Sequence, residues 1–508
     1  MKLERSKNAI RNIVWGLINR VVTLLFPFVI RTILIYTLGS EYLGLNSLFT
    51  SILTVLNLAE LGFSTAIVFS MYKPIAENDS NMICALMAYY KKVYLVIGIA
   101  VFTVGMVIMP FLPRLISGSY PDDINLYGLY LLFLVNTSIS YFLFAYKVSI
   151  LTAYQREDIL SKVDVVLRIV TYSLQALILL RFGNYYAYVI INIAYTVLNN
   201  IVCAFISDKK YPQYKCKGQL SKAAKNSLKK NISGLVIGKI CLVSRNSFDN
   251  IFISAFLGLQ IVAIYGNYYY IMSAIVGILG IFMTAISAGV GNSVVAESVE
   301  KNYKDMNKIN FIYEWIAGWC TICLFCLYQP FMKIWMGEDM LFPTVDVILI
   351  CLYFYSLSMG DVRSKYSHAA GLFWESRYYV LAEAIVNIIL NYFLGKIFGV
   401  SGIILATIVT IVTVNYIWGS HIVFKYYFKQ YKIINFFMKN LLYFLVTVIG
   451  AGVTFGIVHA IPDKGIGMFL VKGAICLIIP NVFFLICYSK TAVFKDAKEM
   501  IIRILRKR

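Results

Sequence analysis

Charged residues are scarce in this sequence. Only 14% of its 508 residues are Asp, Glu, Lys or Arg, whereas 60% are hydrophobic. Soluble proteins contain about 25% charged residues and about 45–50% apolar ones. The composition, with a mean hydropathy of +0.75, therefore excludes an ordinary soluble, disordered or small secreted protein, and leaves a membrane protein with many helices.

Catalytic motifs are also lacking. The chain has three histidines, and they lie far apart, at His368, His421 and His459. It contains no G-x-x-x-x-G-K-[ST] phosphate loop, no G-x-S-x-G nucleophile motif and no H-E-x-x-H zinc motif. We therefore expect no enzyme, no cofactor and no ATP hydrolysis by this chain.

The cysteines form no metal motif either. Cys320, Cys323 and Cys326 are spaced by three within an apolar segment. A metal site would need a fourth ligand and polar groups that support the ligands. We interpret these cysteines as a small apolar stripe that faces a neighbouring helix, and expect no metal.

Long apolar segments dominate the chain. A helix needs about 20 predominantly apolar residues to cross the hydrocarbon core of a bilayer. The sequence predicts about fourteen transmembrane helices, at residues 13–37, 44–70, 93–113, 124–146, 162–181, 185–207, 233–256, 259–290, 309–330, 344–362, 378–396, 401–424, 440–461 and 467–488.

The basic residues between these segments indicate their orientation. With a cytoplasmic N-terminus, the outer loops hold only six Lys or Arg, namely Arg114, Arg181, Lys333, Lys396, Lys464 and Lys472. Most of the others fall on the inner side, as the positive-inside rule requires. The net charge of +21 thus reflects membrane orientation, so we expect cytoplasmic termini and no nucleic-acid partner.

An internal repeat divides the chain. A lysine-rich stretch, 208–232, follows the sixth segment. Shifting the sequence by 219 residues aligns Arg20 with Lys239, and Leu38-Gly39 with Leu257-Gly258. Six spans return the chain to the same side of the membrane, so the two halves have the same orientation, as in transporters built from parallel repeats.

The repeat and the span count together predict the fold. We expect an all-α polytopic membrane protein with two parallel six-helix bundles, 1–207 and 233–424. A basic cytoplasmic linker, 208–232, joins the bundles. Two additional helices in 425–488 and a basic cytoplasmic tail, 489–508, complete the predicted architecture.

Two arginines lie within the first predicted helix. Arg20 and Arg31 are 11 residues apart, which places them on one helical face, roughly 16 Å apart along the axis. A charged side chain within the bilayer costs about 2.5–3.5 kcal/mol and usually faces a protein interior or a water-filled cavity. Because arginine binds phosphate bidentately, the pair predicts a ladder for an anion. The alternative is that each side chain reaches the nearer membrane surface.

Basic residues of the second half are further candidates for substrate binding. Lys239 occupies the position that matches Arg20 in the repeat. Arg245 and Asp249 are four residues apart on a predicted helix, so they can neutralise each other, and Asp249 is a candidate for gating or ion coupling. Asp164 and Arg168 have the same spacing, and we interpret them as a local ion pair.

Two glutamates are candidates for gating or ion coupling. Glu60 lies in the second predicted helix; we favour a structural ion pair with Arg20, and cation binding is the alternative. Glu383, Asn387 and Asn391 form a polar stripe on one face of the eleventh helix. This stripe indicates either a polar cavity wall or hydrogen bonds between helices.

The first 70 residues carry a family resemblance. Arg20 and Arg31 are followed by Leu38-Gly39, Tyr42-Leu43-Gly44-Leu45 and the run LAELGFSTA at 58–66. The segment resembles the start of the bacterial Wzx-type oligosaccharide flippases. These are polysaccharide biosynthesis proteins of the multidrug/oligosaccharidyl-lipid/polysaccharide (MOP) exporter superfamily. The resemblance implies MATE-like helical bundles around a cationic cavity.

The resemblance also implies a function. The expected activity is flipping of polyprenyl-diphosphate-linked oligosaccharide (O-antigen, capsule or exopolysaccharide repeat units) to the outer leaflet of the bacterial plasma membrane by alternating access. The positions that would meet the diphosphate or an acidic sugar are Arg20, Arg31, Lys239 and Arg245. The implied partners are this substrate, membrane lipids and the polysaccharide polymerase machinery. A cation-coupled multidrug exporter and a lipid II flippase remain alternatives; a polymerase or ligase would need a long outer loop that the chain lacks.

Overall fold

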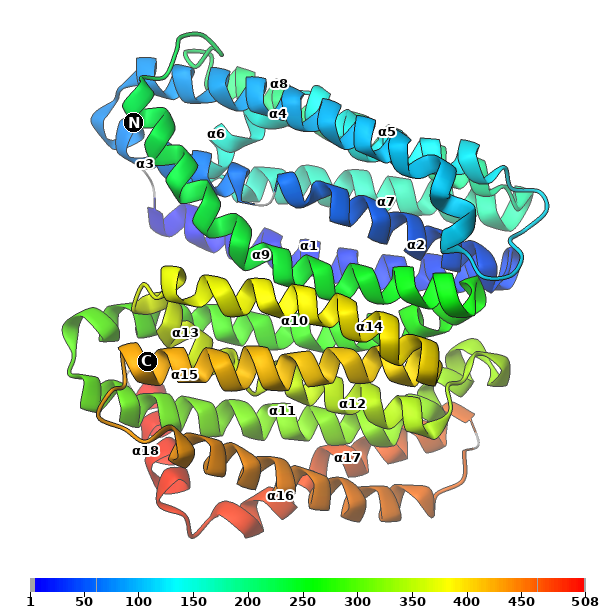
Figure 1. The fold of residues 1–508 in the computed structure, drawn as a ribbon, viewed down its shortest axis with the longest axis vertical. Helices are drawn as coiled ribbons and strands as arrows, with labels where there is room; N and C mark the ends of the chain where they lie inside the picture. Colours follow the sequence, from blue (N-terminus) through cyan, green and yellow to red (C-terminus); the bar gives the residue numbers. More distant parts are fainter. Residues whose placement is uncertain (1–4, 61, 464, 507–508) are drawn as a thin grey trace. The chain divides into compact units, whose positions relative to one another are not determined.

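The computed structural model describes residues 5–60, 62–463 and 465–506; some side chains at the chain ends, at 59 and between 227 and 246 lie outside this description. The described residues are helical and contain no β-strand. The chain divides into two compact units, Met1–Ala263 and Ile264–Arg508 (Figure 1). Helix α9 therefore belongs to the first unit by its contacts, whereas the predicted bundle limits place it in the second; those limits stay a prediction.

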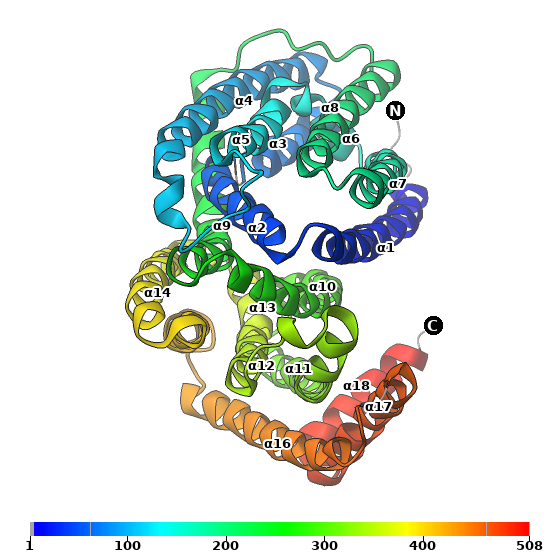
Figure 2. The same ribbon diagram turned by 90° about the vertical axis from the view of Figure 1, so that its right-hand side faces the viewer.

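The first unit contains nine helices among its described residues. They are α1 (Arg5–Thr37), α2 (Ser40–Leu56), α3 (Phe63–Glu77), α4 (Ser80–Ile108), α5 (Leu126–Phe142), α6 (Val148–Ala153), α7 (Glu157–Phe182), α8 (Tyr185–Lys210) and α9 (Lys222–Leu257), with short 3-10 segments η1 (Asn57–Ala59), η2 (Met109–Leu115) and η3 (Ala145–Lys147). Figure 2 shows this unit end-on, with α1 packed along α7, and α7 in turn packs against α8.

The second unit is built around α11. Its elements are α10 (Leu259–Ala296), which begins at the boundary, α11 (Val299–Met336), η4 (Glu338–Met340), α12 (Thr344–Ser358), α13 (Asp361–Ala369), α14 (Phe373–Thr410), the π-helical η5 (Ile411–Trp418), α15 (Gly419–Tyr426), α16 (Ile433–His459), α17 (Gly465–Tyr488) and α18 (Ala492–Arg506). Helices α12, α13, α16, α17 and α18 all pack against α11.

Ten described helices are long and apolar enough to cross a membrane, or eleven if the bent pair α5 and α6 is one span. The protein is thus a multi-pass membrane protein, but the predicted number of fourteen is not confirmed. The predicted helix 44–70 is broken, because η1 and the left-handed Gly62 (φ 97°) separate α2 from α3. The predicted helices 378–396 and 401–424 fall in one helical run, 373–426. The predicted helix 233–256 lies in a segment of which many side chains are outside the description.

The outer face of α1 fits a membrane environment. Ile13, Leu17, Val21, Leu25 and Val29 are all exposed and recur every four residues. This spacing places them on one side of the helix. An apolar stripe of this kind is unfavourable in water but costs nothing against lipid tails.

The glycines at the two repeat-related positions have the same conformation. Gly39 joins α1 to α2 with φ 109° and ψ 171°, and Gly258 joins α9 to α10 with φ 90° and ψ 176°. A side chain with a Cβ rarely adopts a positive φ in this region, so glycine is required at both turns. The sequence repeat thus corresponds to a repeated backbone feature.

The cysteine stripe lies against a neighbouring helix. Cys320, Cys323 and Cys326 are on α11, and the Cys323 Sγ lies 3.5 Å from the backbone oxygen of Cys476 on α17. Among the described residues, no group of three or more His, Cys, Asp or Glu is placed to hold a metal ion. The interpretation as a packing stripe agrees with this contact.

Candidate functional site

Two arginines from separate helices share a polar cavity in the first unit. The cavity, of about 210 Å³, lies between α1, α2, α7 and α8. Its walls are formed by Pro27, Ile30, Arg31, Leu34, Leu43, Asn46, Arg168, Tyr172, Gln175, Tyr188 and Asn192. Arg31 was predicted as a site residue; Arg168, 137 positions later in the sequence, was expected only to neutralise Asp164.

Arg168 is held in place by its own helix and by α8. Its Nε donates to Asp164 Oδ2 at 2.8 Å, and its Nη1 donates to the Tyr172 hydroxyl at 3.1 Å. Its guanidinium also lies 4.9 Å from the centre of the Tyr195 ring, and the Tyr195 hydroxyl donates to Asp164. The predicted ion pair between Asp164 and Arg168 is therefore present.

Uncharged polar groups complete the cavity wall. Gln175 is buried, and its Nε2 donates to the backbone oxygen of Tyr188 at 3.2 Å. Asn46 and Asn192 add amide groups. Two guanidinium groups and several amide or hydroxyl donors around one small space suit an anion such as a phosphate, because charge-assisted hydrogen bonds are stronger than neutral ones.

The other predicted basic residues do not line this cavity. Arg20 is on α1 with its side chain exposed. Arg245 and Asp249 are buried in α9, and both take part in interactions. The Lys239 side chain lies outside the described residues. The substrate-binding roles of Arg20, Lys239 and Arg245 stay predictions, as does the gating or ion-coupling role of Asp249.

Glu60 is bound by tyrosines instead of Arg20. The Tyr94 hydroxyl donates to Glu60 Oε1 at 2.5 Å, and the Tyr141 hydroxyl donates to Glu60 Oε2 at 3.1 Å. Tyr141 also contacts Asn57 Oδ1 at 2.9 Å. Among the described residues, no Arg20–Glu60 ion pair within 4.0 Å is present, so the favoured pairing was wrong. The break after Leu56 places Glu60 beside α4 and α5, where these tyrosines lie.

Removing the Glu60 carboxylate is expected to destabilise the protein. Glu60→Ala leaves the hydroxyl of Tyr94 without its acceptor, whereas Tyr141 keeps Asn57 Oδ1 as an acceptor, and an unsatisfied buried group costs about 1–3 kcal/mol. We expect a loss of about 1–3 kcal/mol, measured as a lower melting temperature in detergent. Glu60→Gln keeps an acceptor and should lose less. Equal melting temperatures for Glu60→Ala and the unchanged protein would contradict this account.

Glu383 belongs to a buried hydrogen-bond network in the second unit. The Asn415 Nδ2 donates to Glu383 Oε2 at 2.8 Å, and Asn387 Nδ2 donates to Thr407 Oγ1 at 3.0 Å. Asn391 Nδ2 in turn approaches Asn387 Oδ1 at 3.4 Å. Of the two predicted uses of this polar stripe, hydrogen bonding between helical segments is the one these contacts display. Whether Glu383 also takes part in ion coupling stays a prediction.

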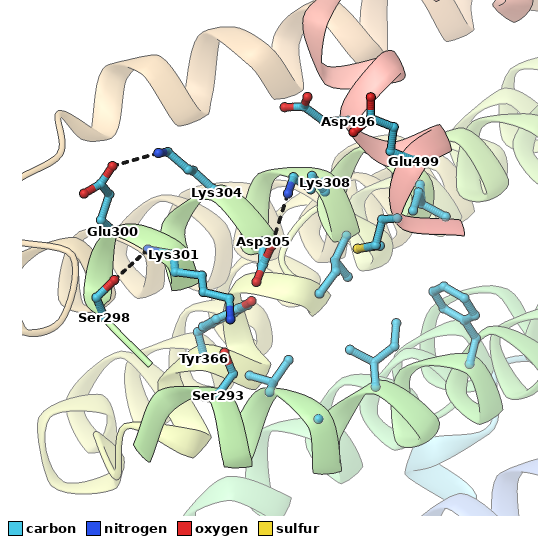
Figure 3. A pocket seen from close by; sticks show the side chains of 17 residues that line it. Ser293, Ser298, Glu300, Lys301, Lys304, Asp305, Lys308, Tyr366, Asp496 and Glu499 are labelled. Atoms are coloured by element: carbon cyan, nitrogen blue, oxygen red, sulfur yellow. Dashed lines mark hydrogen bonds and ion pairs between the residues drawn. The ribbon is translucent and has the colours of Figure 1, made fainter. Parts of the chain in front are cut away.

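A larger pocket lies in the second unit (Figure 3). It occupies about 800 Å³ between α10, α11, α13 and α18. Lys304 and Lys308 of α11 form ion pairs with Glu300 and Asp305 at 2.7 and 3.3 Å, and the acidic residues of α18 approach from another wall. Apolar side chains line the rest: Phe282, Ile286, Val290, Ile309, Ile312 and Met500. Since acids balance the lysines, this pocket is a weaker candidate for an anion than the Arg31 cavity.

Arg363 and Glu314 are buried charged residues of the second unit that were missed in the sequence. Arg363 lies just after the predicted helix 344–362; its side chain is buried, and its Nη2 donates to the Asn415 backbone oxygen at 3.0 Å. Glu314 lies near the start of the predicted helix 309–330 and is also buried. A search for every ionisable residue within five positions of a span end would have found both.

Comparisons with known proteins now place the chain. The model of the polysaccharide biosynthesis protein family matches residues 9–287, which is more than half of the sequence. The chain belongs to this family. No curated protein sequence matched the chain. The expected membership of a polysaccharide biosynthesis protein family is confirmed.

Solved structures show the fold of this family member. The lipid II flippase MurJ in an inward closed conformation is similar, with a TM-score of 0.67 at 16% identity over 94% of this chain and 99% of that one. An inward-facing MATE transporter of the MOP superfamily has a TM-score of 0.60 at 13% identity, over 81% and 97% of the chains. The Vibrio cholerae MATE transporter VcmN gives 0.57 at 11%, over 85% and 99%. The predicted all-helical, MATE-like fold is thus confirmed, whereas its division into two six-helix bundles with two additional helices stays a prediction.

Proposed function

We propose that this polysaccharide biosynthesis family member is a flippase. It moves polyprenyl-diphosphate-linked oligosaccharide from the cytoplasmic to the outer leaflet of the bacterial plasma membrane by alternating access. The observation that carries the proposal is the cavity in which Arg31 and Arg168 converge. Family membership and the fold shared with a lipid II flippase support it.

The chemistry of the substrate explains why such a cavity is needed. A diphosphate is strongly hydrated, and an unpaired charge cannot enter hydrocarbon without a very large free-energy cost. Guanidinium groups and amides replace the water that the diphosphate loses. The polyprenyl tail needs no such replacement because it is as apolar as the lipid around it.

The membrane potential supplies a driving force in the required direction. Moving one charge across 100 mV is worth about 2.3 kcal/mol, so a head group with two negative charges gains about 4–5 kcal/mol on export from an inside-negative cell. Arg31 and Arg168 lower the barrier and leave this driving force unchanged. In this orientation both termini of the protein lie in the cytoplasm. The exported substrate then reaches the outer side, where the polysaccharide polymerase machinery would take it up.

The location of the lipid-linked oligosaccharide in host cells tests this proposal. In cells depleted of the protein, we expect outward-facing glycan on spheroplasts to fall while total polyprenyl-linked glycan after extraction rises. The intact gene should restore the outward-facing fraction. Normal outward exposure would contradict the proposal, and dye efflux would then test the multidrug-exporter alternative. Accumulation of lipid II inside the cell, with normal oligosaccharide export, would identify a lipid II flippase instead.

A further inference from the structure

Glu314 is a carboxylate buried in the interior of the second unit. It lies on α11, and only 2% of its surface is exposed. Among the described residues, Tyr355 of α12 is the side chain that interacts with its carboxylate as a hydrogen-bond donor, and this contact is longer or less well aligned than an ordinary hydrogen bond. None of the described Lys, Arg or His nitrogens lies within the 4.0 Å of an ion pair. The proposed flippase mechanism does not use this group.

The helices packed on α11 surround Glu314 with titratable groups. Those close enough to interact with it electrostatically are Tyr313, Tyr355, Asp361, Tyr416, Tyr443 and Tyr488, from α11, α12, α13, η5, α16 and α17. The charged member of this set, Asp361, has the same sign as Glu314. Arg363, on the same short helix as Asp361, donates to Asn415 instead.

These surroundings suit a neutral carboxyl group. An isolated carboxylate transferred from water to an apolar interior is so costly that such groups usually become neutral by taking up a proton. The nearby charge of Asp361 adds to this cost because it repels a second negative charge. A bound metal ion could neutralise the carboxylate in place of a proton, but no described cluster of three or more His, Cys, Asp or Glu could hold one.

Tyr313, the residue before Glu314 on α11, contacts both Asp361 and the wall of the pocket in the second unit. The hydroxyl of the adjacent Tyr313 donates to Asp361 Oδ2 at 2.5 Å. The Tyr313 ring stacks on Phe282, which lines the pocket, with centroids 6.1 Å apart. Helix α13, which begins with Asp361, also places Tyr366 in the pocket wall. Tyr313 is therefore in contact both with Asp361 and with one residue of the pocket wall.

We propose that Glu314 is a proton-binding site of the second unit, and that it exchanges its proton with the pocket through Tyr313 and Asp361. On binding, the carboxylate takes up one proton and becomes a neutral acid that the interior tolerates. On release, the proton and the negative charge separate again in a state of the protein that admits water. If the protein is the proposed flippase, this exchange couples proton movement to flipping.

Infrared spectroscopy tests the site without any transport assay. Purified protein in nanodiscs at neutral pH should show the carbonyl stretch of a protonated carboxyl group, shifted in D₂O. We expect Glu314→Gln to lose this contribution and Glu314→Asp to retain a shifted one. The matched control is Glu338→Gln, since Glu338 follows α11 with 72% of its side chain exposed and pairs with Lys333 at 2.6 Å. A spectrum of Glu314→Gln identical to that of the unchanged protein would overturn the proposal.

Transport in proteoliposomes separates this proposal from the proposed function. A pH gradient should change the flipping rate of the unchanged protein and of Glu338→Gln. For Glu314→Gln, the ratio of the rates with and without the gradient should fall to unity. If this ratio equals that of the unchanged protein, Glu314 does not couple protons to flipping. If the unchanged protein does not flip the substrate at all, the proposed function fails, whereas the infrared result still decides whether Glu314 binds a proton.

Discussion

Arg31→Gln is expected to reduce the flipping of polyprenyl-diphosphate-linked oligosaccharide by about 10–100-fold, because a charge-assisted hydrogen bond contributes about 1.5–3 kcal/mol. The substitution keeps a polar side chain of similar length in the cavity but removes the charge and the bidentate geometry. Arg31→Lys keeps the positive charge but lacks the planar guanidinium that binds phosphate bidentately. Its flipping rate should therefore lie between the rates of the unchanged protein and of Arg31→Gln. The measurement is the initial rate of flipping in proteoliposomes.

The control for Arg31→Gln is Arg181→Gln. Arg181 is an exposed arginine at the end of α7, outside the residues that line the cavity. Both variants lose one positive charge, so a general effect of charge on insertion would affect them equally. Arg181→Gln should flip at the normal rate. If Arg31→Gln also flips normally while its melting temperature is unchanged, Arg31 does not contact the substrate.

Arg168 is a less suitable test of the same cavity. Arg168→Gln would remove the ion pair at Asp164 as well as a cation in the cavity wall. A lost partner leaves a carboxylate in a partly buried site, and the resulting destabilisation would be difficult to separate from lost binding. The comparison of the two arginines therefore starts with Arg31.

The sequence was sufficient to predict the helical membrane fold and one wall of the cavity. Long apolar runs specify helices by length alone, and Arg31 was recognisable because a charge within such a run is unusual. The convergence of Arg31 with Arg168 was not predictable, since it depends on how α1 packs along α7. Periodicity places a residue on a helical face but does not identify the helix that the face meets.

The two errors around Glu60 and the second span have one local cause. Residues 44–70 are apolar enough to be read as one helix, yet Gly62 adopts a left-handed conformation and ends it. The break turns Glu60 toward Tyr94 and Tyr141. A single glycine within an apolar run is a weak signal in a sequence, because helices also tolerate glycine at a cost of about 1 kcal/mol.

A similar break, at Gly399, makes Gly402 essential for the fold of the second unit. Gly399 has φ 60° and ψ −134° within the run that begins as α14, so the predicted helices 378–396 and 401–424 form a tight helical hairpin. A Cβ at Gly402 would lie 1.9 Å from the backbone oxygen of Leu394. Backbone atoms cannot move aside as a flexible side chain can, so the hairpin would have to open.

We therefore expect Gly402→Ala to lose at least the 1–3 kcal/mol that is typical of overpacked cores, and to accumulate poorly in membranes. The matched control is Gly456→Ala on α16, where an added Cβ meets no atom within 4 Å. That variant should gain about 0.5–1 kcal/mol from helix propensity. The measurement is the melting temperature of each purified variant, followed by fluorescence-detected size-exclusion chromatography.

Because opening the hairpin would separate Asn387 from Thr407, and Glu383 from Asn415, Gly402→Ala should also disrupt the buried network that these contacts form. A melting temperature for Gly402→Ala equal to that of the control would show that the two helical segments do not approach as closely as the hairpin requires.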